Sequence, residues 1–475
     1  MGSIINQILG TAILCMMGIN MGVIFTWPAF TITMFQSQNT TLDRPMTDTE
    51  ISLFTSLSSI GALLSTPTAG FMLDKLGRKN CCIFNSTILA LVWVILVLSR
   101  RVELVLTALF LSGTSSAVFL VASVYISEIC DASIRGTMTS TNMVSYGLGM
   151  LLSYLLGGYI EYSMMLNVGL SLAIAGDCLL FFMKESPMHL MSKGLEEEAK
   201  QSIAYYKKVK TESKEVTDEI ENIKRALNPD LDDSEALPEE EKLKPEIQTK
   251  PPKKISFWKF IKKSRSSRQG FLLSFVVFSA SVFQGLLVIQ IYADALFSEA
   301  IPSLSPNICS VILAVAISIA GIVAAFLTDL AGRRPLMIYS SLGTAASCVV
   351  LGTQFQYHWA PNWLTGILMY VYPVMYTCGA GTVPFVLNAE IFLPEVKSIF
   401  SMILIEYFCL CNFVILFIFN PVLKALGWGP VFYFFTCVSL LTAVYCQIFL
   451  PETKGLTVDE IQGLFSKKKK VRVSA

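Results

Sequence analysis

The sequence predicts an all-α membrane protein with twelve transmembrane helices in two six-helix bundles, joined by a helical linker. Of its 475 residues, 53% are hydrophobic and only 15% are charged, whereas soluble globular proteins carry about 25% charged residues. About half of the charged residues lie in the single stretch 184–268. The remainder is too poor in charge for a soluble enzyme or a disordered chain. A net charge of +1 excludes the basic surface of a nucleic-acid binder.

Apolar segments long enough to cross a bilayer, about 20 residues each, occur twelve times. The first six expected spans are Ile8–Phe30, Ile51–Leu73, Cys81–Leu98, Leu104–Val124, Met138–Ile160 and Met165–Met183. The second six are Gly270–Tyr292, Asn307–Thr328, Leu336–Phe355, Trp363–Leu387, Ile399–Asn420 and Trp428–Leu450. We therefore expect an N-terminal bundle (1–183), a cytoplasmic linker (184–268), a C-terminal bundle (269–450) and a cytoplasmic tail (451–475).

The linker is expected to hold short amphipathic helices rather than a catalytic domain. Apolar residues recur with helical spacing in 194–227, at Ile203, Tyr206, Val209, Val216, Ile220 and Ile223. The following segment, 229–252, is rich in Pro, Glu and Lys, a composition typical of a mobile connection.

Basic residues predict which side of the membrane each loop faces. The short loops after even-numbered spans carry seven of them, Lys75, Arg78, Lys79, Arg135, Arg333, Arg334 and Lys397. The loops after odd-numbered spans carry four, Arg44, Arg100, Arg101 and Lys424. This bias places both termini and the linker in the cytoplasm, and we expect the plasma membrane as the location. Asn39, in an Asn-Thr-Thr sequon, then lies outside and is a candidate for N-glycosylation.

The two halves of the chain repeat one another. Asp74–Lys79 (DKLGRK) matches Asp329–Arg334 (DLAGRR) at an offset of 255 residues. Glu128 and Arg135 match Glu390 and Lys397 at 262, and Glu185 matches Glu452 at 267. Three matched motifs in order at a nearly constant offset indicate duplication. Duplicated six-span halves are typical of carriers in which two bundles rock about a central site.

The repeated charges are expected at the cytoplasmic ends of the helices, where they would form an inner gate. Its candidate residues are Asp74, Arg78, Glu128, Arg135, Asp329, Arg333, Arg334, Glu390 and Lys397. Opposite charges there would bridge helices while the inner face is closed and separate when it opens. The alternative is simple positive-inside topology with charge pairing at helix ends. Repetition of the pattern, with Gly77 and Gly332 permitting tight turns, favours the gate.

These motifs, together with YISEI and RG within 125–136, ESP at 185–187 and PETKGLTVDEI at 451–461, resemble the sugar porters of the major facilitator superfamily. The resemblance covers essentially the whole chain and is strongest to insect facilitated trehalose transporters. It implies two six-helix bundles and sugar transport by alternating access, either facilitative or proton-coupled. The family's cytoplasmic network carries over, with Lys397 where Arg is usual, and Lys lacks the bidentate geometry of Arg.

The sugar-binding positions implied by the resemblance carry over poorly. Met143, Ser281, Val282, Leu287, Ile317, Thr377, Phe385, Phe408 and Cys409 stand where the family has polar residues or Trp, and Asn412 is retained. Each missing hydrogen bond to a buried hydroxyl costs about 1–3 kcal/mol. We take Met143, Gln284, Gln290, Tyr292, Phe385 and Asn412 as candidate substrate-binding residues. Interhelical hydrogen bonding is the alternative for the polar ones.

Glu406 lies within an expected span, and an ionisable residue inside a membrane indicates function by default. It is a candidate for proton coupling or for pairing with a cation, or else it is neutral and hydrogen-bonded. The first span has no carboxylate. Because the resemblance implies an Asp there in proton-coupled members, this departure favours facilitated movement.

The predicted function is a carrier that moves a sugar (trehalose or a hexose) or a related small solute as a facilitative uniporter. The alternative is a transport-dead relative that senses a ligand or binds a partner protein. The expected partners are the solute and the lipid bilayer. The sequence has no phosphate-binding loop, metal-ligand spacing or nucleophile motif, and its 12 cysteines lie mostly in apolar runs. We therefore expect no enzymatic activity, cofactor or metal.

Overall fold

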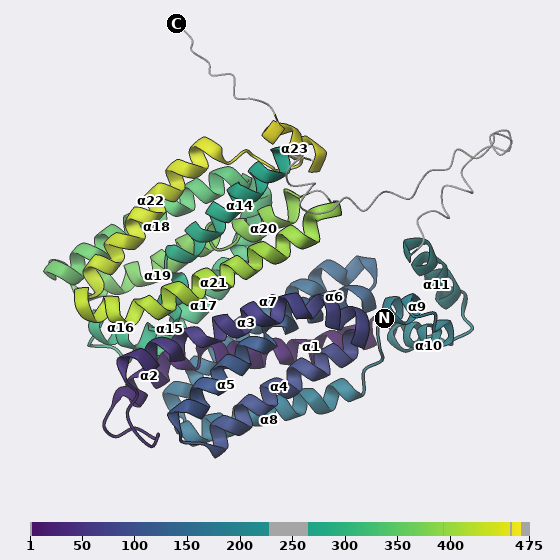
Figure 1. The fold of residues 1–475 in the computed structure, drawn as a ribbon, viewed down its shortest axis with the longest axis horizontal. Helices are drawn as coiled ribbons and strands as arrows, with labels where there is room; N and C mark the ends of the chain where they lie inside the picture. Colours follow the sequence, from purple (N-terminus) through teal and green to yellow (C-terminus); the bar gives the residue numbers. More distant parts are fainter. Residues whose placement is uncertain (1, 228–264, 393, 457, 467–475) are drawn as a thin grey trace, which may run out of the picture.

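The computed structural model describes residues 2–227, 265–392, 394–456 and 458–466. Every regular element in these ranges is a helix, as the composition predicts, and the helices form two bundles side by side (Figure 1). The Pro-rich segment 229–252 and the basic tail at 467–472 lie outside the described residues.

Each expected span corresponds to one helix or to a helix with a break. In the first half they are α1 (Gly2–Thr26) with α2 (Pro28–Gln36), α3 (Asp48–Leu76), α4 (Arg78–Leu98), α5 (Val102–Thr114) with α6 (Val118–Ile129), α7 (Ala132–Tyr159) and α8 (Tyr162–Phe181). In the second half they are α14 (Arg265–Phe283) with α15 (Leu286–Ile291), α17 (Pro306–Ala331), α18 (Arg333–Tyr357), α19 (Asn362–Cys378) with α20 (Val383–Glu390), α21 (Pro394–Leu426) and α22 (Trp428–Phe449). A short helix, α16 (Ala293–Ala300), follows α15.

Nine helical segments of the described chain are long and apolar enough to cross a membrane. The three expected spans not among them are α3, α7 and the α19–α20 pair. α3 and α7 are rich in Ser and Thr, whose hydroxyls bond back to the helix, as Ser56 does to the carbonyl of Ser52. The α19–α20 pair is interrupted between Cys378 and Val383.

The two bundles are joined at one end, which we call the joined end. A single apolar core there includes Trp27 and Phe54 of the first half and Phe419 and Trp428 of the second. Polar contacts also cross between the bundles: Asn420 Nδ2 donates to the carbonyl of Asp48 at 3.0 Å, and Lys424 pairs with the Asp48 carboxylate. The loop that carries Asn39 follows α2 at this end, and Asn39 is exposed.

At the opposite end, which carries Arg78 and Arg333 and which we call the charged end, each bundle has its own core. One cluster is built from the first half and includes Leu180. The other is built from the second half and includes Phe392. In Figure 1 the helices α6 and α20 are apart at this end, whereas α2 lies against α15 and α16 at the joined end. Packing therefore closes one end of the molecule only.

The linker helices α9 (Pro187–Ser192), α10 (Glu196–Lys207) and α11 (Lys214–Leu227) lie at the charged end of the first bundle (Figure 1). Five of the six expected apolar positions are buried, namely Ile203, Tyr206, Val216, Ile220 and Ile223, and Val209 is partly buried. Asn6 of α1 donates to the carbonyl of Tyr205 at 2.6 Å. The helix α23 (Val458–Ser466) packs on α14 of the second bundle. Each bundle thus carries its own peripheral helices.

Candidate functional site

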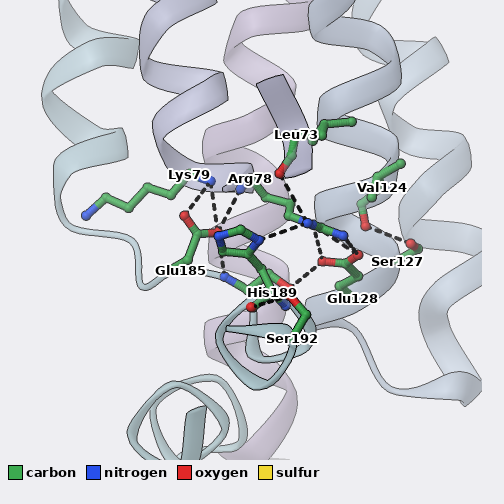
Figure 2. Close-up of polar contacts among 10 residues, drawn as sticks. Leu73, Arg78, Lys79, Val124, Ser127, Glu128, Glu185, His189 and Ser192 are labelled. Atoms are coloured by element: carbon green, nitrogen blue, oxygen red, sulfur yellow. Dashed lines mark hydrogen bonds and ion pairs between the residues drawn. The ribbon is translucent and has the colours of Figure 1, made fainter. Parts of the chain in front are cut away.

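The loop between α3 and α4 places a carboxylate on the start of α4. Gly77 has φ +87°, and a Cβ there would lie 2.5 Å from Oε2 of Glu185, so only glycine fits this turn. Glu185 Oε1 accepts from the backbone N–H groups of Arg78 at 2.9 Å and Lys79 at 3.1 Å (Figure 2). The carboxylate therefore caps the positive end of the α4 dipole.

The Arg78 guanidinium joins α4 to α6. Its Nε donates to Glu128 Oε2 and its Nη2 to Glu128 Oε1, both at 2.8 Å, while Nη1 donates to the carbonyl of Leu73 at 3.3 Å (Figure 2). Ser186 also donates its hydroxyl to Glu128. The Arg78 and Glu128 side chains are only 15% and 12% exposed, so this bidentate pair is stronger than a surface ion pair.

His189 of α9 completes the first network. Its Nδ1 lies 3.1 Å from Nη1 of Arg78 (Figure 2). A guanidinium only donates, so Nδ1 accepts and the ring carries its proton on Nε2. Burial lowers the pKa of His189, and nearby Arg78 and Lys193 lower it further, while Glu185 and Glu128 oppose this. The neutral ring is therefore the form favoured near pH 7. His189 was not among the residues predicted for this site, although it is one of only two histidines and closely follows the ESP motif.

The second half contains the same network. Gly332 has φ +90°, and Glu452 accepts from the backbone N–H groups of Arg333 at 3.0 Å and Arg334 at 3.2 Å. Arg333 Nη2 donates to Glu390 Oε1 at 2.7 Å, and its Nη1 donates to the carbonyl of Thr328 at 3.0 Å. The Thr453 hydroxyl donates to Glu390 at 2.8 Å, as Ser186 does to Glu128. The sequence repeat is therefore also a repeat of hydrogen bonds.

Among the described residues, each of these two arginines pairs with a glutamate of its own half. Arg135 is exposed and reaches only the carbonyl of Cys130, at 3.5 Å, among the described groups. Asp74 is exposed as well. The side chains of Asp329 and Lys397 lie outside the described residues. The helix-capping role of Glu185 and Glu452 was not predicted, although their matched positions in the repeat were a signal for it.

Of the candidate substrate-binding residues, Gln284 stands out. It lies at the break between α14 and α15, next to Gly285 with φ +88°. Its side chain is fully buried, and both Oε1 and Nε2 lack a hydrogen-bond partner among the described residues. A buried amide without partners is costly in a protein interior, so Gln284 stays a candidate for contact with a ligand.

Gln290 and Tyr292 belong to the contact between the bundles. The carbonyl of Gln290 accepts from the Tyr154 hydroxyl of α7 at 2.7 Å. The Tyr292 ring packs on Phe419 with centroids 4.8 Å apart, within the core of the joined end. In this conformation both residues help to close that end.

Phe385 is 44% exposed and makes edge contacts with Phe278 at 5.3 Å and Phe408 at 5.4 Å between ring centroids. Asn412 is buried on α21, and the side chain of Met143 lies outside the described residues. No described hydrogen bond or ring contact joins Gln284, Gln290, Phe385 and Asn412 to one another. The structure therefore brings aromatic rings together but does not gather the polar candidates.

Glu406 lies on α21, which packs against α3 of the other bundle. Its Oε1 is buried and has no hydrogen-bond partner among the described residues. This position at the boundary between the halves keeps Glu406 a candidate for a functional intramembrane acid.

The chain is similar to known sugar transporters over most of its length. The family model described as "Sugar (and other) transporter" matches residues 8–465. The Arabidopsis thaliana sugar transporter ERD6-like 16 is 28% identical over 87% of this chain and 82% of its own length. The facilitated trehalose transporter Tret1 of Polypedilum vanderplanki is 23% identical over 95% of this chain and 87% of its own length.

Solved structures show the same fold. The inward open conformation of the E. coli xylose transporter XylE matches with a TM-score of 0.76 at 19% identity, covering 96% of this chain and 99% of that one. The proton:xylose symporter XylE bound to 6-bromo-6-deoxy-D-glucose matches with a TM-score of 0.67 at 20% identity, covering 98% and 99%. The all-helical arrangement is therefore the major facilitator fold.

Proposed function

The chain belongs to the sugar transporter family of multi-pass, non-enzymatic carriers, and we propose that it moves a sugar or a related small solute by alternating access. The observation that carries this proposal is the difference between its two ends. One core joins the bundles at the joined end, while separate cores hold them at the charged end. A carrier that rocks about a central site has this form in one of its two states.

The charged end faces the cytoplasm in this proposal, and the membrane is the plasma membrane. The basic loops support this orientation, and so does the better agreement with inward open XylE than with the sugar-bound form. Asn39 at the joined end would then face outward, where its sequon is open to glycosylation.

The solute, we infer, is a neutral polyhydroxy compound such as trehalose or a hexose, moved down its gradient. Gln284 supplies an amide with both of its polar atoms unpartnered, and Asn412 supplies a second amide. Phe385 offers an aromatic face for the apolar side of a sugar ring. The helices α1 and α2 contain no carboxylate, which supports uniport.

Uptake in oocytes tests this function directly. Labelled trehalose and glucose would be offered at pH 5.5 and 7.5, with surface expression measured in the same cells. We expect saturable uptake with little dependence on pH. Gln284→Leu should reduce that uptake at least tenfold because a hydroxyl loses its amide partner. The matched control is Gln354→Leu in α18, whose amide is already bonded to the Ala360 backbone.

A disulfide across the joined end tests alternating access separately from solute identity. The short Asn420 side chain reaches the Asp48 backbone, so Asp48→Cys with Asn420→Cys is positioned to lock this end closed. Oxidation should abolish uptake and reduction should restore it, while either single variant stays active. Full uptake by the oxidised, cross-linked protein would contradict the mechanism.

A transport-dead sensor is the second candidate function. It is favoured by Leu287, Ile317, Phe408 and Cys409, which stand where polar sugar contacts were expected. Binding of labelled sugar to purified protein, without counterflow in proteoliposomes, would support the sensor. Counterflow together with binding would support the carrier.

A further inference from the structure

A groove lies on the surface of the second bundle between α18 and α22, near the charged end. It has a volume of about 740 Å³ and is lined by Arg334, Pro335, Ile338, Tyr339, Leu342, Ala443, Val444, Gln447, Ile448 and Glu452. Figure 1 shows α18 and α22 on the side of the second bundle that faces away from the first. Both helices are long and apolar enough to span a membrane, so the groove faces lipid rather than the solute pathway.

The groove is apolar along its length. The side chains of Tyr339, Leu342, Val444 and Ile448 are 72%, 43%, 58% and 50% exposed. Ala443 is small and buried between them, which leaves a channel between the two helices. Its volume falls within the roughly 300–1,000 Å³ of ordinary ligand pockets.

One end of the groove is cationic. Arg334 Nη2 donates to the carbonyl of Gln447 at 2.6 Å, while its buried Nε has no partner among the described residues. Lys454 is exposed but does not line the groove, and its Nζ donates to the carbonyl of Leu330 at 2.8 Å. Glu452 also lines this end. Its carboxylate oxygens accept from two backbone N–H groups at the start of α18 and from the backbone N–H groups of the two residues that follow Glu452. A phosphate at this end therefore meets the Arg334 guanidinium, while the Glu452 carboxylate keeps its charge but holds its oxygens against backbone donors.

The depth of the groove matches one leaflet. Arg334 and Leu342 are eight residues apart on α18, which corresponds to about 12 Å at 1.5 Å per residue. Half of a hydrocarbon core about 30 Å thick is close to this length. We propose that the groove binds one anionic phospholipid, with an acyl chain along Tyr339, Leu342 and Val444 and the phosphate at Arg334.

The first half provides an internal comparison. At the offsets of 255 and 267 that relate the halves, Lys79 matches Arg334, Thr87 matches Leu342, and Asp177 matches Val444. Lys79 Nζ donates to the carbonyl of Phe181 at 2.9 Å. A carboxyl group at acyl-chain depth is an unfavourable neighbour for an alkyl chain. The α4–α8 surface should therefore not bind this lipid.

Photocrosslinking tests the site without any substitution. The full chain would be reconstituted in phosphatidylcholine vesicles that contain a small fraction of phosphatidylglycerol with a photoreactive acyl chain. We expect adducts on 338–342 and 444–448 of the second half. Equal labelling of 83–87 and 177–181 in the first half would overturn the proposal, because it would indicate ordinary contact with annular lipid.

Two variants and a matched control define the chemistry by native mass spectrometry. Leu342→Trp fills the groove and should reduce retention of phosphatidylglycerol at least fivefold, while Thr87→Trp on the matched surface leaves it unchanged. Arg334→Gln should abolish the preference for phosphatidylglycerol over phosphatidylcholine, and Arg334→Lys should restore most of it. Unchanged retention in Leu342→Trp, or an unchanged preference in Arg334→Gln, would refute the site. Both readouts measure binding, so the result is independent of the transported solute.

Discussion

The two charged networks share a layout of hydrogen bonds but differ in detail and in surroundings. Arg78 donates to Glu128 through Nε and Nη2, whereas Arg333 donates to Glu390 through Nη2. In the first half, α9 covers the network and places His189 against Arg78. In the second half Leu456 occupies the position that matches His189 by the repeat, and it is 39% exposed. Accordingly Glu128 is 12% exposed, whereas Glu390 is 27% exposed. Duplication preserved this layout. The carboxylate is more exposed in the second half, whereas the arginines are exposed to a similar extent, 15% for Arg78 and 11% for Arg333.

The largest expected effect is loss of the buried arginine in the first network. Arg78→Ala leaves Glu128 buried without its cation and should destabilise the protein by about 3 kcal/mol. Arg333→Ala should destabilise the protein less, by about 2 kcal/mol, because water reaches the Glu390 carboxylate more easily. Melting of the detergent-solubilised protein, followed by size-exclusion chromatography, measures both. Equal losses would show that burial by α9 is energetically unimportant.

Substitution of the glycines in the two turns should cause the next largest loss of stability. Gly77→Ala requires a left-handed conformation and brings a Cβ within 2.5 Å of Glu185, at a cost of about 2 kcal/mol. Gly332→Ala meets Glu452 at 2.7 Å and should cost a similar amount. Gly194→Ala serves as a control, because it shares the positive φ but has no atom within 4 Å of the new Cβ. A loss in Gly194→Ala as large as in Gly77→Ala would assign the whole effect to backbone strain.

Acidification is expected to lower the stability of the folded protein by a smaller amount, through the first half only. Burial lowers the pKa of His189 below its ordinary value near 6.5, so the unfolded chain takes up this proton at higher pH than the folded chain does. The stabilisation is therefore complete above about pH 6.5 and declines as the pH falls toward the folded-state pKa. His189→Asn keeps an acceptor near Arg78 but cannot titrate. The melting temperature of the wild type should fall more between pH 7.5 and 5.5 than that of His189→Asn, and parallel curves would exclude His189 as the source.

The smallest expected effect is the coupling free energy between the two networks, which is the departure from additivity in a variant that lacks both arginines. Because Arg78 and Arg333 pair with glutamates of their own halves, the losses in the double alanine variant should add within about 0.5 kcal/mol. A coupling energy above about 1 kcal/mol would instead support a gate that bridges the halves in another state. In that case the double variant should also shift the carrier toward the inward-open state and increase the labelling of cysteines on the inner path.

The chain's pattern of apolar segments was sufficient to predict the helices. All twelve expected spans are found as helices, since a stretch of about 20 apolar residues has few other stable forms in a bilayer. The break at Gly285 was not predicted, because it depends on packing against neighbouring helices. Gly285 lies so close to the Phe435 ring of α22 that a Cβ would overlap it.

The sequence predicted some residues of the candidate sites and not others, because contacts between helices depend on packing. The repeat singled out Arg78, Glu128, Arg333 and Glu390, which form two ion pairs in the structure, and their role as a gate stays a prediction. Their partners could not be inferred, since sequence offsets do not say whether a charge pairs within a bundle or across two. His189 was missed because its contact with Arg78 depends on how α9 folds back against α4 and α6.

By itself the sequence determined the class of protein, its duplicated organisation and the residues able to form the charged networks. These follow from composition, spacing and residue type, which act locally along the chain. The tertiary structure decided which carboxylate meets which arginine, which end of the molecule is closed, and which amide is buried without a partner. These features depend on long-range packing, where side chains far apart in the sequence share one desolvated space.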